Sequence, residues 1–194
     1  MRVLITGGSG TIGRSFIKNY TDYFDIFSLS RDENKQTQLS RYFPSVKQYL
    51  GSVEDRETVF RVFEEVKPDI VIHTAAVKHI NLAEKQPIQT CKVNIVGSLN
   101  IIDASVRCDI PVTVAVSTDK ACSYESVYGG SKWLMERCFL EANSNRNKFS
   151  VCRFANVAHS DGSVLPFWLD AKKEGKPLEL TDPEMNRLMF TQDD

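Results

Sequence analysis

Thr6-Gly7-Gly8-Ser9-Gly10-Thr11-Ile12-Gly13 directly follows a short apolar run, Val3-Leu4-Ile5, near the start of this 194-residue sequence. Glycines recur at every third position of this stretch. Gly7 permits a tight turn, Gly10 lets the backbone approach a pyrophosphate, and Gly13 lets a helix pack closely on the strand. The N-terminus of that helix offers N–H groups and partial positive charge to an anion. We therefore predict a strand, a phosphate-binding loop and a helix.

The rest of the chain continues this alternation. Short apolar runs predict strands at 26–30, 46–50, 69–74, 112–117 and 149–154, and amphipathic stretches predict helices at 12–20, 32–42, 52–66, 88–106 and 126–142. This order is typical of an α/β fold with a Rossmann-like, doubly wound parallel sheet. We expect residues 1–155 to form this domain. Residues 156–194 then begin a small, truncated C-terminal substrate lobe with a helix at 164–174.

Two helices are predicted from more specific patterns. Ser52, with Asp55 three residues later, resembles a capping box and places a helix start there. One long amphipathic helix is indicated by apolar residues three or four positions apart, at Ile88, Cys91, Ile95, Leu99, Ile102 and Val106.

Composition excludes several functional classes. Hydrophobic residues make up 42% of the chain, and 24 basic against 25 acidic residues leave a net charge of −1, so a nucleic-acid partner is not indicated. The five cysteines form no C-x-x-C pair, which favours buried, reduced thiols. None of the three histidines has zinc-ligand spacing, so we expect no metal. No apolar run is long enough for membrane insertion, and we expect a cytoplasmic protein.

The end of the second predicted strand bears on the choice of dinucleotide. An acidic residue there would bind the ribose hydroxyls of NAD, whereas an arginine would accommodate the 2′-phosphate of NADP. Ser30 and Arg31 are followed by Asp32, so the signal is mixed, but Arg31 favours NADP over NAD.

Tyr128 and Lys132 form a Y-x-x-x-K pattern on the predicted helix 126–142. One helical turn separates them, so their side chains point the same way. We expect the lysine ammonium to lower the pKa of the tyrosine, whose phenolate could then accept a proton from an alcohol.

Thr118, Asp119 and Lys120 follow the fifth predicted strand, at the edge where open α/β sheets bind ligands. Thr118 can hydrogen-bond a reacting alcohol. Asp119 and Lys120 place an acid beside a base, as an elimination of water requires. The alternative is an ion pair exposed at the end of a strand.

The residues resemble a known family, the UDP-N-acetylglucosamine 4,6-dehydratases of polysaccharide and flagellin-sugar biosynthesis, in the extended short-chain dehydrogenase/reductase superfamily. The matching stretches start at Thr6, Ser30, His73, Ser117, Tyr128, Arg153, Gly162 and Leu180, and read TGGSGTIG, SRDENKQ, HTAAVKHI, STDKA, YGGSK, RFANV, GSVLPF and LTDPEMNR.

The resemblance implies a redox-neutral dehydration of UDP-N-acetylglucosamine to a 4-keto-6-deoxy sugar nucleotide with tightly bound NADP⁺. Tyr128 would deprotonate the C4 hydroxyl, Lys120 would remove the C5 proton, and Asp119 would help the C6 hydroxyl leave. The implied catalytic residues are Thr118, Asp119, Lys120, Tyr128 and Lys132.

The resemblance also implies two sets of binding residues and a homo-oligomer paired through the long helices. The cofactor set is Thr6, Gly7, Ser9, Gly10, Thr11, Ile12, Gly13, Ser30, Arg31, Ala75, Ala76, Lys78, Asn94, Tyr128 and Lys132. The UDP-sugar set is Lys78, Arg153, Asn156, Ser163 and Arg187. Two alternatives are a UDP-sugar 4-epimerase, against which Asp119 and Lys120 speak, and a non-catalytic, truncated NADP-binding module.

Overall fold

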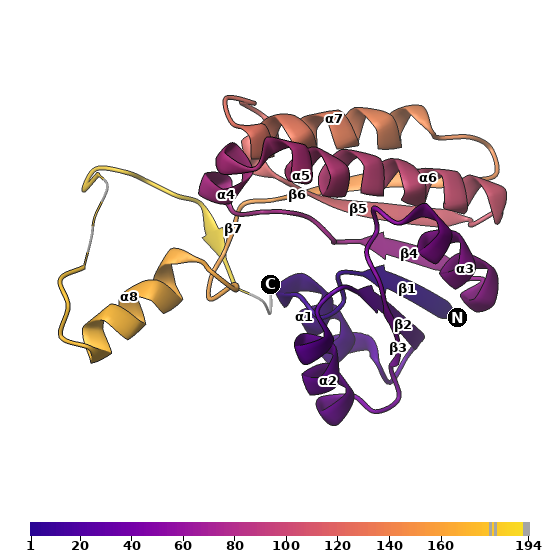
Figure 1. Ribbon diagram of the computed structural model, residues 1–194, viewed down its shortest axis with the longest axis horizontal. Helices are drawn as coiled ribbons and strands as arrows, with labels where there is room; N and C mark the ends of the chain where they lie inside the picture. The colour runs from indigo at the N-terminus through magenta and orange to yellow at the C-terminus, as the bar shows by residue number, and fades with distance from the viewer. Residues whose placement is uncertain (179, 181, 192–194) are drawn as a thin grey trace. The chain divides into compact units, whose positions relative to one another are not determined.

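A computed structural model describes residues 1–178, 180 and 182–191 (Figure 1). The chain divides into two compact units, Met1–Arg153 and Phe154–Asp194. The first unit contains the large sheet and the helices that cover it, and the second is a small unit with one helix and a two-stranded sheet.

A six-stranded sheet forms the centre of the first unit, in the order β3-β2-β1-β4-β5-β6. The pairings from β3 through β5 are all parallel. The strand order reverses between β1 and β4, which is the switch point of a doubly wound fold and the place where such folds bind ligands. The predicted Rossmann-like sheet is therefore confirmed. Its strands are β1 Arg2–Thr6, β2 Asp25–Ser30, β3 Lys47–Leu50, β4 Ile70–His73, β5 Val112–Thr118 and β6 Lys148–Phe154.

Helices cover both faces of this sheet, as Figure 1 shows. Their bounds are α1 Thr11–Tyr20, α2 Glu33–Tyr42, α3 Arg56–Val66, α4 Ile80–Lys85, α5 Pro87–Cys91, α6 Gly97–Arg107 and α7 Val127–Glu141, with a π-helical turn η1 at Lys92–Val96 and a 3₁₀ turn η2 at Asp119–Ala121.

Alternation along β1 divides the core between the two faces. Val3 and Ile5 pack with the α1 residue Ile17 and the α2 residue Leu39. Leu4 points to the other face, into a cluster that contains Phe63 of α3, Ile101 of α6 and Phe139 of α7. The buried strand β1 thus anchors helices on both sides of the site-bearing edge.

The long helix predicted at 88–106 is interrupted. It consists of α5, the π-helical turn η1 and α6, with helical backbone through the joins at Cys91 and Gly97. Several of its larger apolar residues, among them Ile88, Leu99 and Val106, are exposed. The buried face carries Val93 and Ile101 and otherwise small or polar residues, namely Thr90, Asn94, Gly97, Ser98, Asn100, Ala104 and Ser105.

The predicted capping box at Ser52 is wrong. Helix α3 begins at Arg56, and Asp55 is its N-cap, accepting hydrogen bonds from the backbone N–H groups of Glu57 and Thr58. A carboxylate at the N-cap satisfies two of the N–H groups that lack helical partners. The hydrogen bonds from Thr58 hold the pKa of Asp55 below its ordinary value.

The prediction of buried cysteines is also wrong. Cys91, Cys122 and Cys152 are exposed free thiols, and Cys108 and Cys138 are partly exposed. Cys152 lies on β6 at the edge of the sheet, where one side of the strand has no neighbouring strand.

The second unit contains β7 Asn156–Val157 paired in parallel with β8 Met189–Phe190, and helix α8 Val164–Lys173 close to the predicted 164–174. A cavity of about 340 Å³ lies against α8, and none of the predicted site residues lines it. Its lining residues are Phe167, Asp170, Ala171, Glu174, Lys176 and Pro177.

Candidate active site

The glycine loop joins β1 to α1 through backbone contacts that leave no room for side chains. Gly7 has a φ of 75°, which favours glycine, and a Cβ there would lie 2.9 Å from the backbone nitrogen of Ala75. A Cβ on Gly13 would lie 2.5 Å from the Cα of Gly8. Gly10 is the N-cap of α1 and provides no side-chain hydrogen bond to the first turn. These features fit an anion at the helix N-terminus.

Gly8 is a further constrained position that the glycine spacing did not identify. A Cβ on Gly8 would lie 2.9 Å from the Cβ of Ser28 on β2. The contact joins residues 20 positions apart, so only the paired strands reveal it.

The end of β2 is ordered by local hydrogen bonds. The Ser30 hydroxyl is buried and accepts from the Ser9 N–H at 3.2 Å, tying this strand end to the glycine loop. Asp32 is the N-cap of α2, and its carboxylate accepts a hydrogen bond from the Lys35 N–H at 2.9 Å. Arg31 is exposed between them.

Asn94 joins the loop after β4 to α7. Its side chain accepts from the Val77 N–H at 2.7 Å and donates to the Val77 carbonyl at 2.9 Å and to the Ser131 hydroxyl at 3.0 Å. Ser131 donates in turn to the Tyr128 carbonyl at 2.8 Å. The loop with Ala75 and Ala76 is thereby connected to the helix that carries the predicted Tyr–Lys pair. Lys78, predicted for both cofactor and substrate, is exposed at the end of this loop.

Tyr128 and Lys132 lie on α7 as predicted, but the expected lowering of the tyrosine pKa is wrong. Burial raises the pKa of Tyr128, and the negative charge of Asp119 raises it further, against a hydrogen bond with Thr118 that lowers it. Lys132 is only 4% exposed. Burial lowers the pKa of its ammonium to about 8, although the carboxylate of Glu136 acts in the opposite direction.

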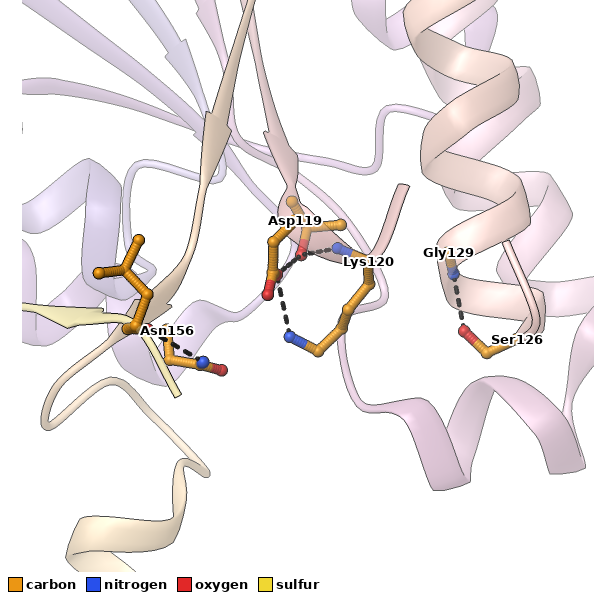
Figure 2. A network of polar contacts seen from close by, with 7 residues as sticks. Asp119, Lys120, Ser126, Gly129 and Asn156 are labelled. Carbon is orange, nitrogen blue, oxygen red and sulfur yellow. Dashed lines mark hydrogen bonds and ion pairs between the residues drawn. The ribbon is translucent and has the colours of Figure 1, made fainter. Parts of the chain in front are cut away.

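Thr118, Asp119 and Lys120 gather at the carboxyl end of β5 (Figure 2). Thr118 donates to Asp119 Oδ1 at 2.9 Å, and Lys120 Nζ lies 3.1 Å from the same oxygen. Burial raises the pKa of Asp119, but the hydrogen bonds from Lys120 and Thr118 outweigh it and leave the pKa below its ordinary value. The acid and base predicted from the sequence therefore form a half-exposed ion pair.

Helix α7 is capped beside this pair and packs closely against it. The Ser126 hydroxyl accepts from the Gly129 N–H at 3.0 Å, as Figure 2 shows, and Glu84 of α4 accepts from the Val127 N–H at 2.7 Å. A Cβ on Gly129 would lie 2.5 Å from the Lys120 carbonyl oxygen. Gly129 thus lets α7 approach the segment that carries Asp119 and Lys120.

The residues predicted to bind the UDP-sugar are divided between the two units. In the first unit, Arg153 donates to both carboxylate oxygens of Glu136. In the second unit, Asn156 donates to the Leu188 carbonyl, Ser163 is the N-cap of α8, and Arg187 is exposed.

His73 is a buried residue for which the sequence suggested no role. Its Nδ1 lies 2.7 Å from the Thr6 hydroxyl and its Nε2 lies 3.0 Å from the Ser98 hydroxyl. Ser98 donates its own proton to the Asn94 carbonyl at 2.7 Å, so it must accept from His73 Nε2–H, and Nδ1 must accept from Thr6. Burial, with a smaller contribution from the nearby charge of Lys132, lowers the pKa of His73 to about 3.

The described part of the chain contains neither a cluster of metal ligands nor a membrane-spanning helix. No group of three His, Cys, Asp or Glu side chains there could hold a metal ion. None of the helices in those residues is both long and apolar enough to cross a bilayer.

Comparison with known proteins places this arrangement in a family. Residues 3–194 match the family described as polysaccharide biosynthesis protein. This chain belongs to that family. The match agrees with the resemblance to the extended short-chain dehydrogenase/reductase superfamily drawn from the sequence.

Family relatives include two kinds of nucleotide-sugar enzyme. An inverting UDP-N-acetylglucosamine 4,6-dehydratase of Campylobacter jejuni is 37% identical over 202 residues, covering 99% of this chain and 60% of the relative. A UDP-glucose 4-epimerase of Rickettsia canadensis is 32% identical over 201 residues, covering 97% and 58%. The structure of Pen from Bacillus thuringiensis is similar with a TM-score of 0.93 at 32% identity, covering 99% and 61%. The chain therefore spans about three fifths of these proteins.

The two glycines of YGGSK provide a matched test of packing at the site. Gly129→Ala should destabilise the chain by about 1–3 kcal/mol, because its Cβ would overlap the Lys120 carbonyl. Gly130 has no atom within 4 Å of an added Cβ, so Gly130→Ala should stabilise α7 by up to about 1 kcal/mol. Urea unfolding measures both; equal effects of the two changes would contradict the close contact.

His73 should make the chain acid-sensitive. Its pKa is about 3 in the folded chain and about 6.5 when unfolded, so between these values the unfolded chain binds one more proton. Stability should therefore fall by up to about 1.4 kcal/mol per pH unit as the pH drops from 6.5 toward 3. Urea midpoints from pH 7 to 4.5 should fall less steeply in His73→Gln. The exposed-histidine control His79→Gln should keep the wild-type slope, and an identical slope in all three chains would count against His73.

Proposed function

We propose that the intact protein is an NADP-dependent UDP-N-acetylglucosamine 4,6-dehydratase of surface polysaccharide or glycan biosynthesis, acting in the cytoplasm. The observation that carries the proposal is the Asp119–Lys120 ion pair beside Thr118, whose hydroxyl also hydrogen-bonds Tyr128. A 4-epimerase needs the tyrosine but no acid–base pair. The dehydratase of Campylobacter jejuni, 37% identical, supports the same choice.

The cofactor part of the proposal rests on the glycine loop and the end of β2. The uncapped first turn of α1, the close backbone turn at Gly7 and the buried Ser30 suit a dinucleotide pyrophosphate and ribose. Asp32 is engaged as the cap of α2, which leaves Arg31 for a 2′-phosphate. The chemistry that NADP⁺ would supply when bound is acceptance of the hydride from C4 and its return to C6 after water has left, so that the cofactor is not consumed.

Once it has lost its own proton to solvent, Tyr128 would accept, as a phenolate, the proton of the C4 hydroxyl, which Thr118 orients. The resulting ketone acidifies the hydrogen at C5, and Lys120 would remove it as Asp119 protonates the departing C6 hydroxyl. Asp119 Oδ1 and Lys120 Nζ are 3.1 Å apart. Transfer of one proton from Lys120 to Asp119 therefore turns the ion pair into the neutral base and acid that this step needs.

Substrate contacts are proposed for Lys78, Arg153, Asn156, Ser163 and Arg187, whose polar groups suit a diphosphate and a sugar. We also propose a homo-oligomer. Exposed apolar side chains occur on both α6 and α7, which pack against each other, and on the helical segment before α6; they are Ile88, Val96, Leu99, Val106, Trp133, Leu134 and Leu140. Exposed apolar side chains on neighbouring helices suit a protein interface.

Arg31→Ala tests the cofactor. Hydrogen bonds to charged groups contribute about 1.5–3 kcal/mol, so the change should weaken NADP⁺ binding roughly tenfold or more and leave NAD⁺ binding unaltered. Calorimetric titration measures both affinities. Arg41→Ala, at the other end of α2, should change neither. Equal wild-type affinities for the two dinucleotides would remove the case for NADP.

Lys120→Ala tests the reaction. In deuterated water, the intact wild-type protein should convert UDP-N-acetylglucosamine to a 4-keto-6-deoxy product with deuterium at C5, detected by NMR and mass spectrometry. The variant should still bind NADP⁺ but lose about 10²–10⁴-fold of the C5 exchange, because positioned acid–base groups contribute rates of that order. Lys85→Ala, an exposed lysine of α4, should match the wild type.

Two outcomes would contradict the dehydratase assignment. Formation of UDP-N-acetylgalactosamine without deuterium would identify a 4-epimerase. Firm NADP⁺ binding without any turnover of the sugar would identify a non-catalytic module.

A further inference from the structure

Glu136 is a buried carboxylate one helical turn beyond Lys132 on α7. Both residues are 4% exposed, and a spacing of four places their side chains on the same face of the helix. A charged group at such depth requires a partner. Neither the sequence motifs nor the proposed reaction gives Glu136 a role.

Arg153 supplies that partner from β6. Its Nε donates to Glu136 Oε1 at 2.8 Å and its Nη2 to Oε2 at 2.6 Å, the two-pronged geometry that orients a carboxylate most firmly. Its Nη1 donates to Cys122 Sγ at 3.3 Å. Cys122 is the C-cap of η2, so one guanidinium connects α7 to the turn that carries Asp119 and Lys120.

The charges of Lys132, Glu136 and Arg153 alternate in sign. Burial raises the pKa of Glu136, but the hydrogen bonds from Arg153 outweigh it and keep the carboxyl ionised. The ionised carboxylate opposes the burial that lowers the pKa of Lys132 to about 8. Without that negative charge, the buried lysine would lose its proton at lower pH.

Other titratable groups near Lys132 do not replace Glu136. His73 on β4 is neutral, and Tyr128 on α7 is protonated, because burial shifts both of their pKa values in that direction. Asp119 on η2 is paired with Lys120. The remaining charged groups in the elements packed against α7 are exposed or half-exposed, namely Glu84, Lys85, Lys92, Asp103, Arg107 and Lys120.

We propose that Glu136 is a positioning residue that keeps the buried Lys132 side chain charged, and that Arg153 holds Glu136 ionised and in place. The inference deepens the proposed function, since it concerns the lysine of the Tyr–Lys pair. It also gives Arg153 a role within the first unit, whether or not the guanidinium meets a substrate.

NMR titration of the chain labelled with ¹³C-lysine tests the proposal without cofactor or sugar. The Lys132 Cε signal is identified by its loss in Lys132→Arg. Its midpoint should lie near pH 8 in the wild type and fall by about one unit or more in Glu136→Gln, the size expected for an opposite charge at close range. Glu141→Gln, an exposed glutamate on the same helix, should leave the midpoint unchanged.

The sign of the shift separates electrostatics from loosened packing. Water entering a disrupted α7 would raise the Lys132 midpoint toward the ordinary lysine value, whereas loss of the carboxylate lowers it. If Glu136→Gln does not fold, the double variant Glu136→Gln/Arg153→Met removes both partners of the ion pair together and should also show a fall in the Lys132 midpoint. In a chain labelled with ¹³C-glutamate, the Glu136 Cδ signal should titrate at higher pH in Arg153→Met than in the wild type.

An unchanged or raised Lys132 midpoint in the folded Glu136 variants would overturn the role of Glu136. An unchanged Glu136 titration in Arg153→Met would overturn that of Arg153. Neither result depends on turnover, so a failure here leaves the dehydratase proposal standing, and an inactive enzyme could still show both shifts.

Discussion

Backbone meets backbone without an intervening side chain at the points where helices approach the ligand-binding edge of the sheet. Gly13 packs against the backbone of Gly8 at the start of α1, and Gly129 of α7 packs against the carbonyl of Lys120 in η2. A single methyl group at these points would exceed the available space, and close-packed interiors absorb such an insertion only by moving backbone. The positions of the helix N-terminus, the Tyr–Lys pair and the acid–base pair all depend on these contacts.

A directed chain of buried hydrogen bonds connects the glycine loop to α7. Protons are donated from Thr6 to His73, from His73 to Ser98 and from Ser98 to the Asn94 carbonyl, while the Asn94 side chain reaches Ser131 on α7. Each residue of this chain provides the hydrogen-bond partner of the next, so replacing one leaves a buried polar group without a partner. Asn94 lies in the π-helical turn η1, so the irregular part of the long helix is also the part that carries these contacts.

The sheet and the loop were predictable because their signals are local. Apolar runs such as Val3–Ile5 and the glycine spacing each lie within a few residues. The inner face of 88–106 was not, because Gly97, Ser98 and Ala104 face the core through close packing while larger residues such as Leu99 face outward. The positions of Thr118, Asp119, Lys120 and Tyr128 followed from strand ends and helical spacing. The pKa of Tyr128 did not follow, because the burial that raises it depends on contacts made by residues distant in sequence.

The charges of the site are coupled in a way that favours the proposed chemistry. Tyr128 is a weak acid in this arrangement because it is buried and because the Asp119 carboxylate raises its pKa. When the proton of Lys120 passes to Asp119, that negative charge disappears, and its effect on the phenol disappears with it. The transfer that creates the neutral acid and base thus also makes Tyr128 easier to ionise. Lys132 takes no part in this exchange, and the role proposed for Glu136 is to keep the Lys132 side chain charged while the exchange occurs.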